Sequence, residues 1–103
     1  MNIKEVRVTE VGPRDGFQSE KTVLKTEDKI DIINNLIEAG FPRIEVSSFV
    51  SPKAIPQLAD AEIILSKVNR STDTILAALV PNARGALRAV DARLDQIVVF
   101  LSA

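Results

Sequence analysis

The feature that most limits the possible folds is a regular alternation of strand and helix patterns along the chain. Runs rich in β-branched or apolar residues occupy 7–11, 43–46, 74–79 and 96–101, and segments with helical spacing separate them. Strands joined through helices run parallel, with right-handed crossovers. The order βαβαβαβ therefore predicts an α/β fold of parallel β/α units, as an open sheet or as half of a barrel.

The three intervening segments carry helix start and stop signals. The first begins at Thr26, the expected N-cap, and ends at Gly40, which supplies a left-handed stop. The second covers about 55–68, and the third starts at Pro81-Asn82, where Asn82 is the simplest N-cap. The side chains expected to face the core are Ile30, Ile33, Leu36 and Ile37 in the first helix, Leu58, Ala61, Leu65 and Val68 in the second, and Ala83, Ala86, Leu87 and Val90 in the third.

Length sets a limit on what the chain can form alone. Its 103 residues fit one modest domain without an internal boundary, whereas a complete eight-stranded β/α barrel needs about 250 residues. The sequence ends just after the run 96–101, so this apolar strand is expected to lie at an uncovered sheet edge. We therefore expect part of a larger domain, which forms homo-oligomers or associates with a missing C-terminal part.

Composition excludes several classes of function. The net charge is −1 and the aromatic residues are four Phe, which argues against nucleic acid or an anionic membrane as a partner. The chain has no Cys and no His, so it cannot by itself form thiolate zinc sites or use histidine catalysis. The N-terminus lacks a signal-peptide pattern, and no apolar run is long enough to span a membrane. These observations predict a cytoplasmic location.

Reactive side chains gather directly after the first predicted strand, where Gly12-Pro13 breaks the ladder. Arg14 offers a fork of donors that could neutralise an oxyanion. Asp15 offers hard oxygen ligands suited to Mg²⁺ or Mn²⁺. Gln18 could bind a substrate carboxylate or a metal-bound water. Taken alone, an Arg-Asp pair after a strand is more often a local salt bridge than a catalytic pair.

Glu45 is the second candidate, because it lies between aliphatic residues in the predicted strand 43–46 and an unpaired buried carboxylate is costly. It could hold Arg14 in a site, or form a purely structural ion pair with Arg43 or Arg14. Nearby Ser47 and Ser48 are interpreted as turn or solvent-facing residues. Phe49 and Phe100 are expected in the core.

Three blocks of sequence also resemble a known family. Residues 11–20 (VGPRDGFQSE), residues 44–53 (IEVSSFVSPK) followed by Pro56-Gln57, and residues 77–85 (AALVPNARG) are similar to the 3-hydroxy-3-methylglutaryl-CoA lyases, metallolyases with a TIM (β/α)8 barrel. The resemblance implies that 1–103 is the N-terminal part of a single barrel domain, the first half of its β/α units. It also implies an acyl-CoA substrate, a divalent metal (Mg²⁺ or Mn²⁺), and retro-Claisen cleavage to acetyl-CoA and acetoacetate.

The resemblance assigns roles to four residues and matches a fifth. Asp15 matches a metal ligand of the lyases, whose two histidines and asparagine lie further downstream and are absent here. Arg14 matches the residue that stabilises the enolate oxygen and binds substrate. Gln18 and Glu45 match positions that support substrate binding and the geometry of the catalytic site. Lys21 matches a basic position whose role is less certain.

Two alternatives to a lyase stay open from the sequence. A condensing acyltransferase of the isopropylmalate or homocitrate synthase type typically carries D-T-T-L-R-D-G-E-Q here, whereas this chain has Val11-Gly12-Pro13 before Arg14. A non-catalytic half-barrel or assembly module is favoured by the missing histidines.

Overall fold

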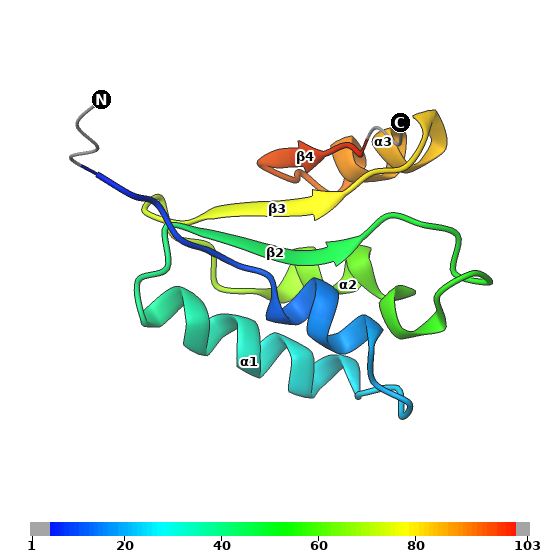
Figure 1. Ribbon diagram of the computed structural model, residues 1–103, viewed down its shortest axis with the longest axis horizontal. Helices are drawn as coiled ribbons and strands as arrows, with labels where there is room; N and C mark the ends of the chain where they lie inside the picture. Colours follow the sequence, from blue (N-terminus) through cyan, green and yellow to red (C-terminus); the bar gives the residue numbers. More distant parts are fainter. Residues whose placement is uncertain (1–4, 101–103) are drawn as a thin grey trace.

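A computed structural model describes residues 5–100 and shows one parallel sheet (Figure 1). Its strands are β1 (Thr9–Glu10), β2 (Arg43–Ser48), β3 (Ile75–Leu79) and β4 (Gln96–Val98), in the spatial order β1-β2-β3-β4. Each neighbouring pair is parallel. The α/β fold of parallel β/α units is thus confirmed.

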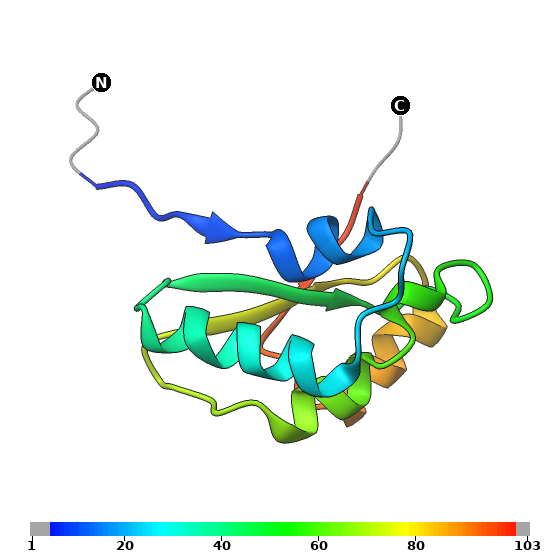
Figure 2. The ribbon, with the colours of Figure 1, turned by 90° about the horizontal axis from the view of Figure 1, so that it is seen from below.

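Helical segments connect the strands in the expected order. They are η1 (Gly12–Gly16), α1 (Thr26–Glu38), η2 (Pro56–Leu58), α2 (Ala61–Lys67) and α3 (Ala83–Asp91). Figure 2 shows α1 running alongside β2, while η1 lies beside the end of that strand. No helix in the described part of the chain is long and apolar enough to cross a membrane.

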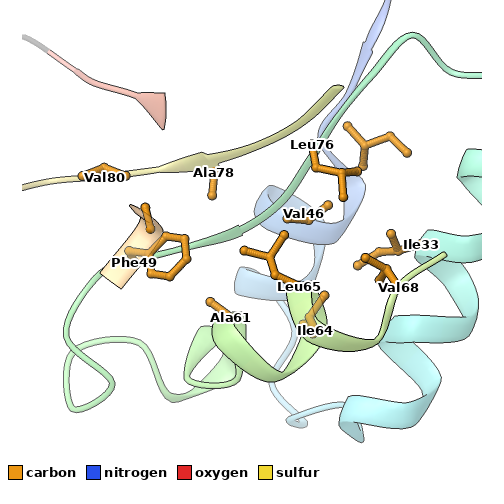
Figure 3. Close-up of a cluster of buried hydrophobic side chains, with 12 residues drawn as sticks. Ile33, Val46, Phe49, Ala61, Ile64, Leu65, Val68, Leu76, Ala78 and Val80 are labelled. Atoms are coloured by element: carbon orange, nitrogen blue, oxygen red, sulfur yellow. The ribbon is translucent and has the colours of Figure 1, made fainter. Parts of the chain in front are cut away.

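The core fills the space between one face of the sheet and the helices, because the strands turn their apolar side chains toward that face (Figure 3). Burial of this apolar surface is the main favourable term in folding. The strands contribute Ile44 and Val46 (β2) and Leu76 and Ala78 (β3) to this buried cluster. The helices contribute Ile33 (α1), Ala61, Ile64 and Leu65 (α2) and Ala89 (α3), and the connecting segments contribute Phe49, Val68 and Val80. The prediction that Phe49 lies in the core is confirmed.

The first helix agrees with the sequence prediction at its end but not at its start. Gly40 has φ +89°, the left-handed conformation expected of a glycine stop. Thr26, however, is the first helical residue rather than the N-cap, and Lys25 precedes it in extended geometry. The Thr26 hydroxyl instead donates to Asp60 Oδ2 at 2.7 Å. A contact with a distant residue has replaced the local cap.

The single helix predicted over 55–68 is wrong, since the structure divides it into η2 and α2. Asp60 lies between the two with φ −102° and ψ 23°, outside helical geometry. Its carboxylate binds side chains of α1, which stabilises this interruption. The expected inward side chains are confirmed as buried: Leu58, Ala61, Leu65 and Val68.

The predicted buried face of the third helix is wrong for Ala83, Leu87 and Val90, which are exposed, whereas Ala86 packs against the core as expected. Leu87 and Val90 are 70% and 73% exposed, while Gly85 and Ala89 are the buried positions. The reason is a close approach between α3 and the chain after β2. A Cβ on Gly85 would lie 2.7 Å from the Phe49 carbonyl oxygen, so only glycine fits there. The Asn82 N-cap is confirmed, because its Oδ1 accepts from the Gly85 backbone N–H at 2.8 Å.

The ends of the strands differ from the prediction as well. The strand predicted over 7–11 is reduced to Thr9–Glu10, whereas β2 extends two residues beyond 43–46. β4 ends at Val98, and Leu101 lies outside the described residues. Phe100 is 67% exposed, so its placement in the core was wrong. β4 is the last strand in the sheet order of the described residues, and its Ile97 is 53% exposed.

Candidate active site at the carboxyl ends of the strands

Arg14 and Glu45 form the centre of the candidate site. Arg14 Nε donates to Glu45 Oε1 at 3.0 Å, and the two side chains are 15% and 9% exposed. Glu45 lies between Ile44 and Val46, which face the core, so strand alternation turns it to the opposite face of the sheet. The structure therefore brings together the two residues that the sequence selected for catalysis.

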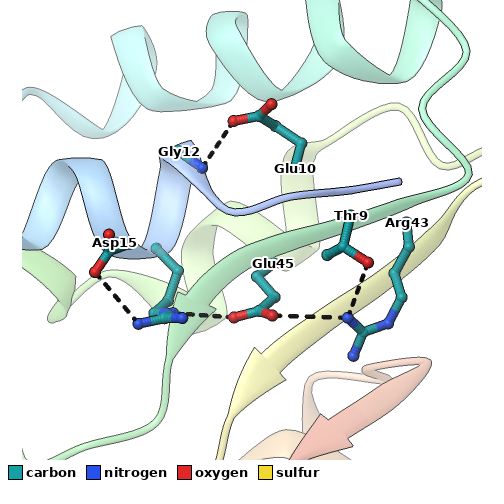
Figure 4. Close-up of polar contacts among 7 residues, drawn as sticks. Thr9, Glu10, Gly12, Asp15, Arg43 and Glu45 are labelled. Carbon is teal, nitrogen blue, oxygen red and sulfur yellow. Dashed lines mark hydrogen bonds and ion pairs between the residues drawn. The ribbon is translucent and has the colours of Figure 1, made fainter. Parts of the chain in front are cut away.

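Arg43 forms an ion pair with the second carboxylate oxygen of Glu45. Its NH1 lies 3.6 Å from Glu45 Oε2 and donates to the Thr9 hydroxyl at 3.3 Å, while its Nε donates to Gln96 Oε1 at 2.9 Å. Arg43 thereby links β2 to β1 and β4. The ion pairs considered for Glu45, with Arg14 and with Arg43, are both present. Figure 4 shows the Glu45 carboxylate with Arg43 on one side of it.

This arrangement leaves Arg14 with donors to spare. A guanidinium carries five N–H donors in a fixed fork, and Glu45 uses the one on Nε. The Asp15 carboxylate, which is 66% exposed, lies 3.6 Å from Arg14 Nη1 and forms a longer ion pair with it. Arg14 can therefore neutralise developing negative charge on a bound oxygen atom while Glu45 keeps its orientation fixed.

The segment that carries these residues is helical rather than a loop. After β1, Glu10 Oε1 accepts from the Gly12 backbone N–H at 2.9 Å and stabilises the turn (Figure 4). Pro13 is the second residue of η1, a π-helix whose first turn does not need the N–H that proline lacks. Gln18 lies one turn beyond Arg14 and is half-buried. Local backbone geometry thus places Arg14, Asp15 and Gln18 at the same strand end.

Two further polar groups lie at the end of β2. Ser47 and Ser48 are completely buried, so their interpretation as turn or solvent-facing residues was wrong. The structure gives neither hydroxyl a hydrogen-bond partner among the described residues. The register shifts between Glu45 and Ser47, which indicates a bulge of the kind often found beside active sites. Unpaired buried hydroxyls are uncommon, and these two lie in the strand that also carries Glu45.

A hollow of about 400 Å³ lies elsewhere, between α2 and the start of α3. Arg88 and Glu62 meet there through two hydrogen bonds of 3.0 and 2.7 Å. The bond to Arg88 lowers the pKa of Glu62, and the same bond raises the pKa of Arg88. Glu62 and Arg88 thus bind each other in this hollow. Arg14 and Glu45 are not among the residues that line it. We interpret it as a structural contact between helices.

A buried lysine, Lys29, was not predicted from the sequence. Lys29 is 1% exposed, and its Nζ lies 2.9 Å from Asp60 Oδ1 and 3.2 Å from Asp60 Oδ2. A signal existed, because Lys29 precedes Ile33 by four residues and so shares the buried face of α1. Spacing alone places a lysine on that face, but its acidic partner lies 31 residues away.

A divalent metal fits the donor set only in part. Asp15 supplies hard oxygen atoms at the strand end, the type of ligand that Mg²⁺ and Mn²⁺ favour. Within the described residues, however, there is no group of three or more acidic, histidine or cysteine side chains able to hold an ion. This part of the chain can contribute one carboxylate ligand, and any further ligands must come from elsewhere.

Several known lyases resemble this chain in sequence and in fold. The hydroxymethylglutaryl-CoA lyase of Bacillus subtilis is 46% identical over 100 residues, which cover 97% of this chain and 33% of that protein. Its crystal structure matches with a TM-score of 0.92 at 44% identity, covering 96% of this chain and 33% of that one. An HMG-CoA lyase from Acinetobacter baumannii, solved in complex with coenzyme A and 3-methylmalate, matches with a TM-score of 0.90 at 48% identity, covering 96% and 33%.

The relatives differ in length, place and substrate. The chain spans 33% of the Bacillus relative and 21% of a mitochondrial relative from Arabidopsis thaliana. The relative from Danio rerio is named as cytoplasmic and the one from Arabidopsis as mitochondrial. Because the relatives differ in this way, the cytoplasmic location of this protein stays a prediction. A Pseudomonas aeruginosa relative carries the name 3-hydroxy-3-isohexenylglutaryl-CoA/hydroxy-methylglutaryl-CoA lyase. The four-stranded sheet corresponds to the N-terminal part of the TIM barrel in these lyases. Since the HMGL-like family model matches residues 5–103, the chain belongs to the HMGL-like family.

Proposed function

We propose that this chain is the N-terminal part of a single barrel domain that cleaves 3-hydroxy-3-methylglutaryl-CoA, or a close analogue, to acetyl-CoA and acetoacetate. The observation that carries the proposal is the Arg14–Glu45 pair, 3.0 Å apart, in which Arg14 follows the carboxyl end of β1 and Glu45 lies in the middle of β2. Active sites of β/α barrels lie at the carboxyl ends of the strands. The names of the relatives support the acyl-CoA substrate class.

In this proposal each side chain has a separate task. Arg14 donates to the substrate oxygen that becomes an enolate as the carbon–carbon bond breaks, and it binds that oxygen beforehand. Glu45 keeps the Arg14 fork in position and balances its charge. Gln18 binds a polar group of the substrate. The proton acceptor for the 3-hydroxyl is not among these residues, so it must come from another part of the barrel.

Asp15 is the proposed metal ligand of this chain. A bound Mg²⁺ or Mn²⁺ would polarise the oxygen atoms of the substrate and lower the pKa of its hydroxyl group. The exposure of Asp15, 66%, leaves its carboxylate open to an ion. Because one carboxylate does not hold a catalytic ion, we propose that the chain acts together with the remaining barrel.

The test uses a barrel fusion, in which this chain replaces the equivalent N-terminal third of the Bacillus subtilis lyase. We expect the fusion to cleave hydroxymethylglutaryl-CoA in the presence of Mn²⁺, whereas the chain alone is inert. Turnover by the chain alone would contradict the incomplete site. A folded fusion without cleavage would favour a non-catalytic module, and one that condenses acetyl-CoA with a keto acid would favour the synthase alternative.

We propose hydroxymethylglutaryl-CoA as the first candidate substrate, but one finding favours a second candidate with a longer side chain. The Pseudomonas aeruginosa relative acts on a 3-hydroxyglutaryl-CoA with a longer side chain as well, and it is 41% identical over 104 residues. Comparing kcat/KM for the two substrates in the barrel fusion separates these possibilities. A ratio near one would indicate that this part of the barrel does not select the side chain.

A further inference from the structure

A buried ion pair outside the catalytic residues connects the first helix to the region after β2. Lys29 of α1 is 1% exposed and Asp60 is 14% exposed, and Nζ lies 2.9 Å from Oδ1. The Thr26 hydroxyl adds a hydrogen bond of 2.7 Å to the same carboxylate. Burying an ammonium group is costly unless it is paired and hydrogen-bonded, and here both conditions are met.

The same lysine also contacts the segment 17–25, which joins η1 to α1 in Figure 2. Its Nζ lies 5.9 Å from the centre of the Phe17 ring, within the range of a cation–π interaction. Lys29 also donates to the Gln57 carbonyl. The Gln57 amide in turn donates to the Glu20 carbonyl at 3.2 Å. One buried cation thus fixes the segment at Phe17 directly and at Glu20 through Gln57.

These two points lie on either side of Gln18, which the proposed function assigns to substrate binding. The exposed residues of the segment give it little apolar burial of its own. Backbone hydrogen bonds to η1 hold the start of the segment at Phe17 and Ser19, and the contacts with Lys29 and Gln57 connect it to α1 and to the region after β2. Arg14 is held independently, because its partner Glu45 belongs to β2.

We propose that Lys29 is a positioning residue for substrate binding, which holds the segment 17–25 so that Gln18 faces the substrate. This inference rests on the proposed function for the role of Gln18. It goes beyond it by naming a residue that touches neither substrate nor metal. Loss of the ammonium group frees the segment and weakens substrate binding, while the Arg14–Glu45 pair continues to support the chemical step.

The test measures Lys29→Met and Phe17→Leu in the barrel fusion, with Lys25→Met as matched control because Lys25 is an exposed lysine of the same segment. In Lys29→Met we expect KM to rise about tenfold with kcat changed by less than about threefold. A merely structural role lowers the folded fraction, which reduces the apparent kcat and leaves KM unchanged. Phe17→Leu removes only the ring contact, so it should fold and give a smaller rise in KM.

Hydrogen exchange supplies a readout that does not need activity. Backbone amides of 17–25 should exchange at least about tenfold faster in Lys29→Met than in Lys25→Met, while amides of β2 and β3 keep their protection. If the fusion is inactive but exchange changes as expected, the proposed function fails and the positioning contact stands. Equal exchange in the two variants, or an unchanged KM in both Lys29→Met and Phe17→Leu, would overturn the inference.

Discussion

Arg14 Nε and Glu45 Oε1 lie 3.0 Å apart although 31 residues separate the two in the chain. This contact joins η1 to β2 on the face of the strand opposite Ile44 and Val46, which belong to the core. Arg43 completes the arrangement from the other carboxylate oxygen, 3.6 Å away. One acidic side chain thus orients the arginine proposed for catalysis and is itself fixed by a second arginine.

Removing the charge of Glu45 should destabilise the fold. In Glu45→Gln, Arg14 and Arg43 face each other without a counter-charge, so we expect a loss of about 3 kcal/mol in the free energy of unfolding. Urea denaturation of the barrel fusion measures this loss. Glu38→Gln, at the exposed end of α1, is the control and should change stability little. Equal stabilities of the two variants would show that Glu45 does not hold the arginines.

Asp15→Asn should weaken metal binding without affecting the fold. The side chain is 66% exposed and its contact with Arg14 is long, 3.6 Å, so its charge adds little to stability. We expect the affinity of the barrel fusion for Mn²⁺, measured by isothermal titration calorimetry, to fall about tenfold or more. Unchanged affinity would show that the ion is bound by other residues.

Gly85→Ala should be destabilising by about 1–3 kcal/mol, because the added Cβ would lie 2.7 Å from the Phe49 carbonyl oxygen. The matched control is Gly16→Ala, where the new methyl group would meet no atom within 4 Å. Thermal denaturation of both variants tests the prediction. A Gly85→Ala variant as stable as Gly16→Ala would mean that α3 can move away from β2 at no cost.

The ion pair of Glu62 and Arg88 should make stability depend on pH. The hydrogen bond from Arg88 lowers the pKa of Glu62 from its ordinary 4.5. A carboxyl group whose pKa is lower in the folded state stabilises the fold above the unfolded-state pKa, and this contribution disappears as the pH falls through the folded-state value. The stability difference between the parent protein and Glu62→Gln should therefore be largest near neutral pH and shrink in acid. Because Glu62 is 47% exposed, we expect a small effect.

A double-mutant cycle with Arg88→Gln isolates that interaction, since each single variant removes one partner. The coupling energy should decrease on acidification in step with the protonation of Glu62. A coupling energy that stays constant from neutral pH to below the ordinary pKa would contradict the assignment.

The fold could be predicted from sequence because each β/α unit carries its own periodicity and stop signals, such as Gly40 and Asn82. The errors arose where a residue far away in the chain decides the outcome. Asp60 interrupts the second helix through α1, and the close approach at Gly85 turns Leu87 toward the surface. No local pattern contains this information.

In the candidate site, too, local sequence predicted some residues correctly, whereas the burial of others depends on distant parts of the chain. Arg14 and Asp15 were selected because they directly follow a strand, and Glu45 because a carboxylate between aliphatic residues needs a partner. The structure brings Arg14 and Glu45 together. Ser47, Ser48 and Lys29 were misjudged or missed, since polar residues are usually exposed and their burial depends on the packed sheet and helices.

The most direct test of the central claim is the turnover number of the barrel fusion with Arg14→Gln, assayed on hydroxymethylglutaryl-CoA. The account predicts that kcat falls about 100-fold or more, because the enolate oxygen loses its cationic donor. It also predicts a stable fold, since Glu45 keeps Arg43 as its partner. Arg7→Gln, an exposed arginine before β1, should leave kcat unchanged. A folded Arg14→Gln fusion that retains the kcat of its parent would contradict the account.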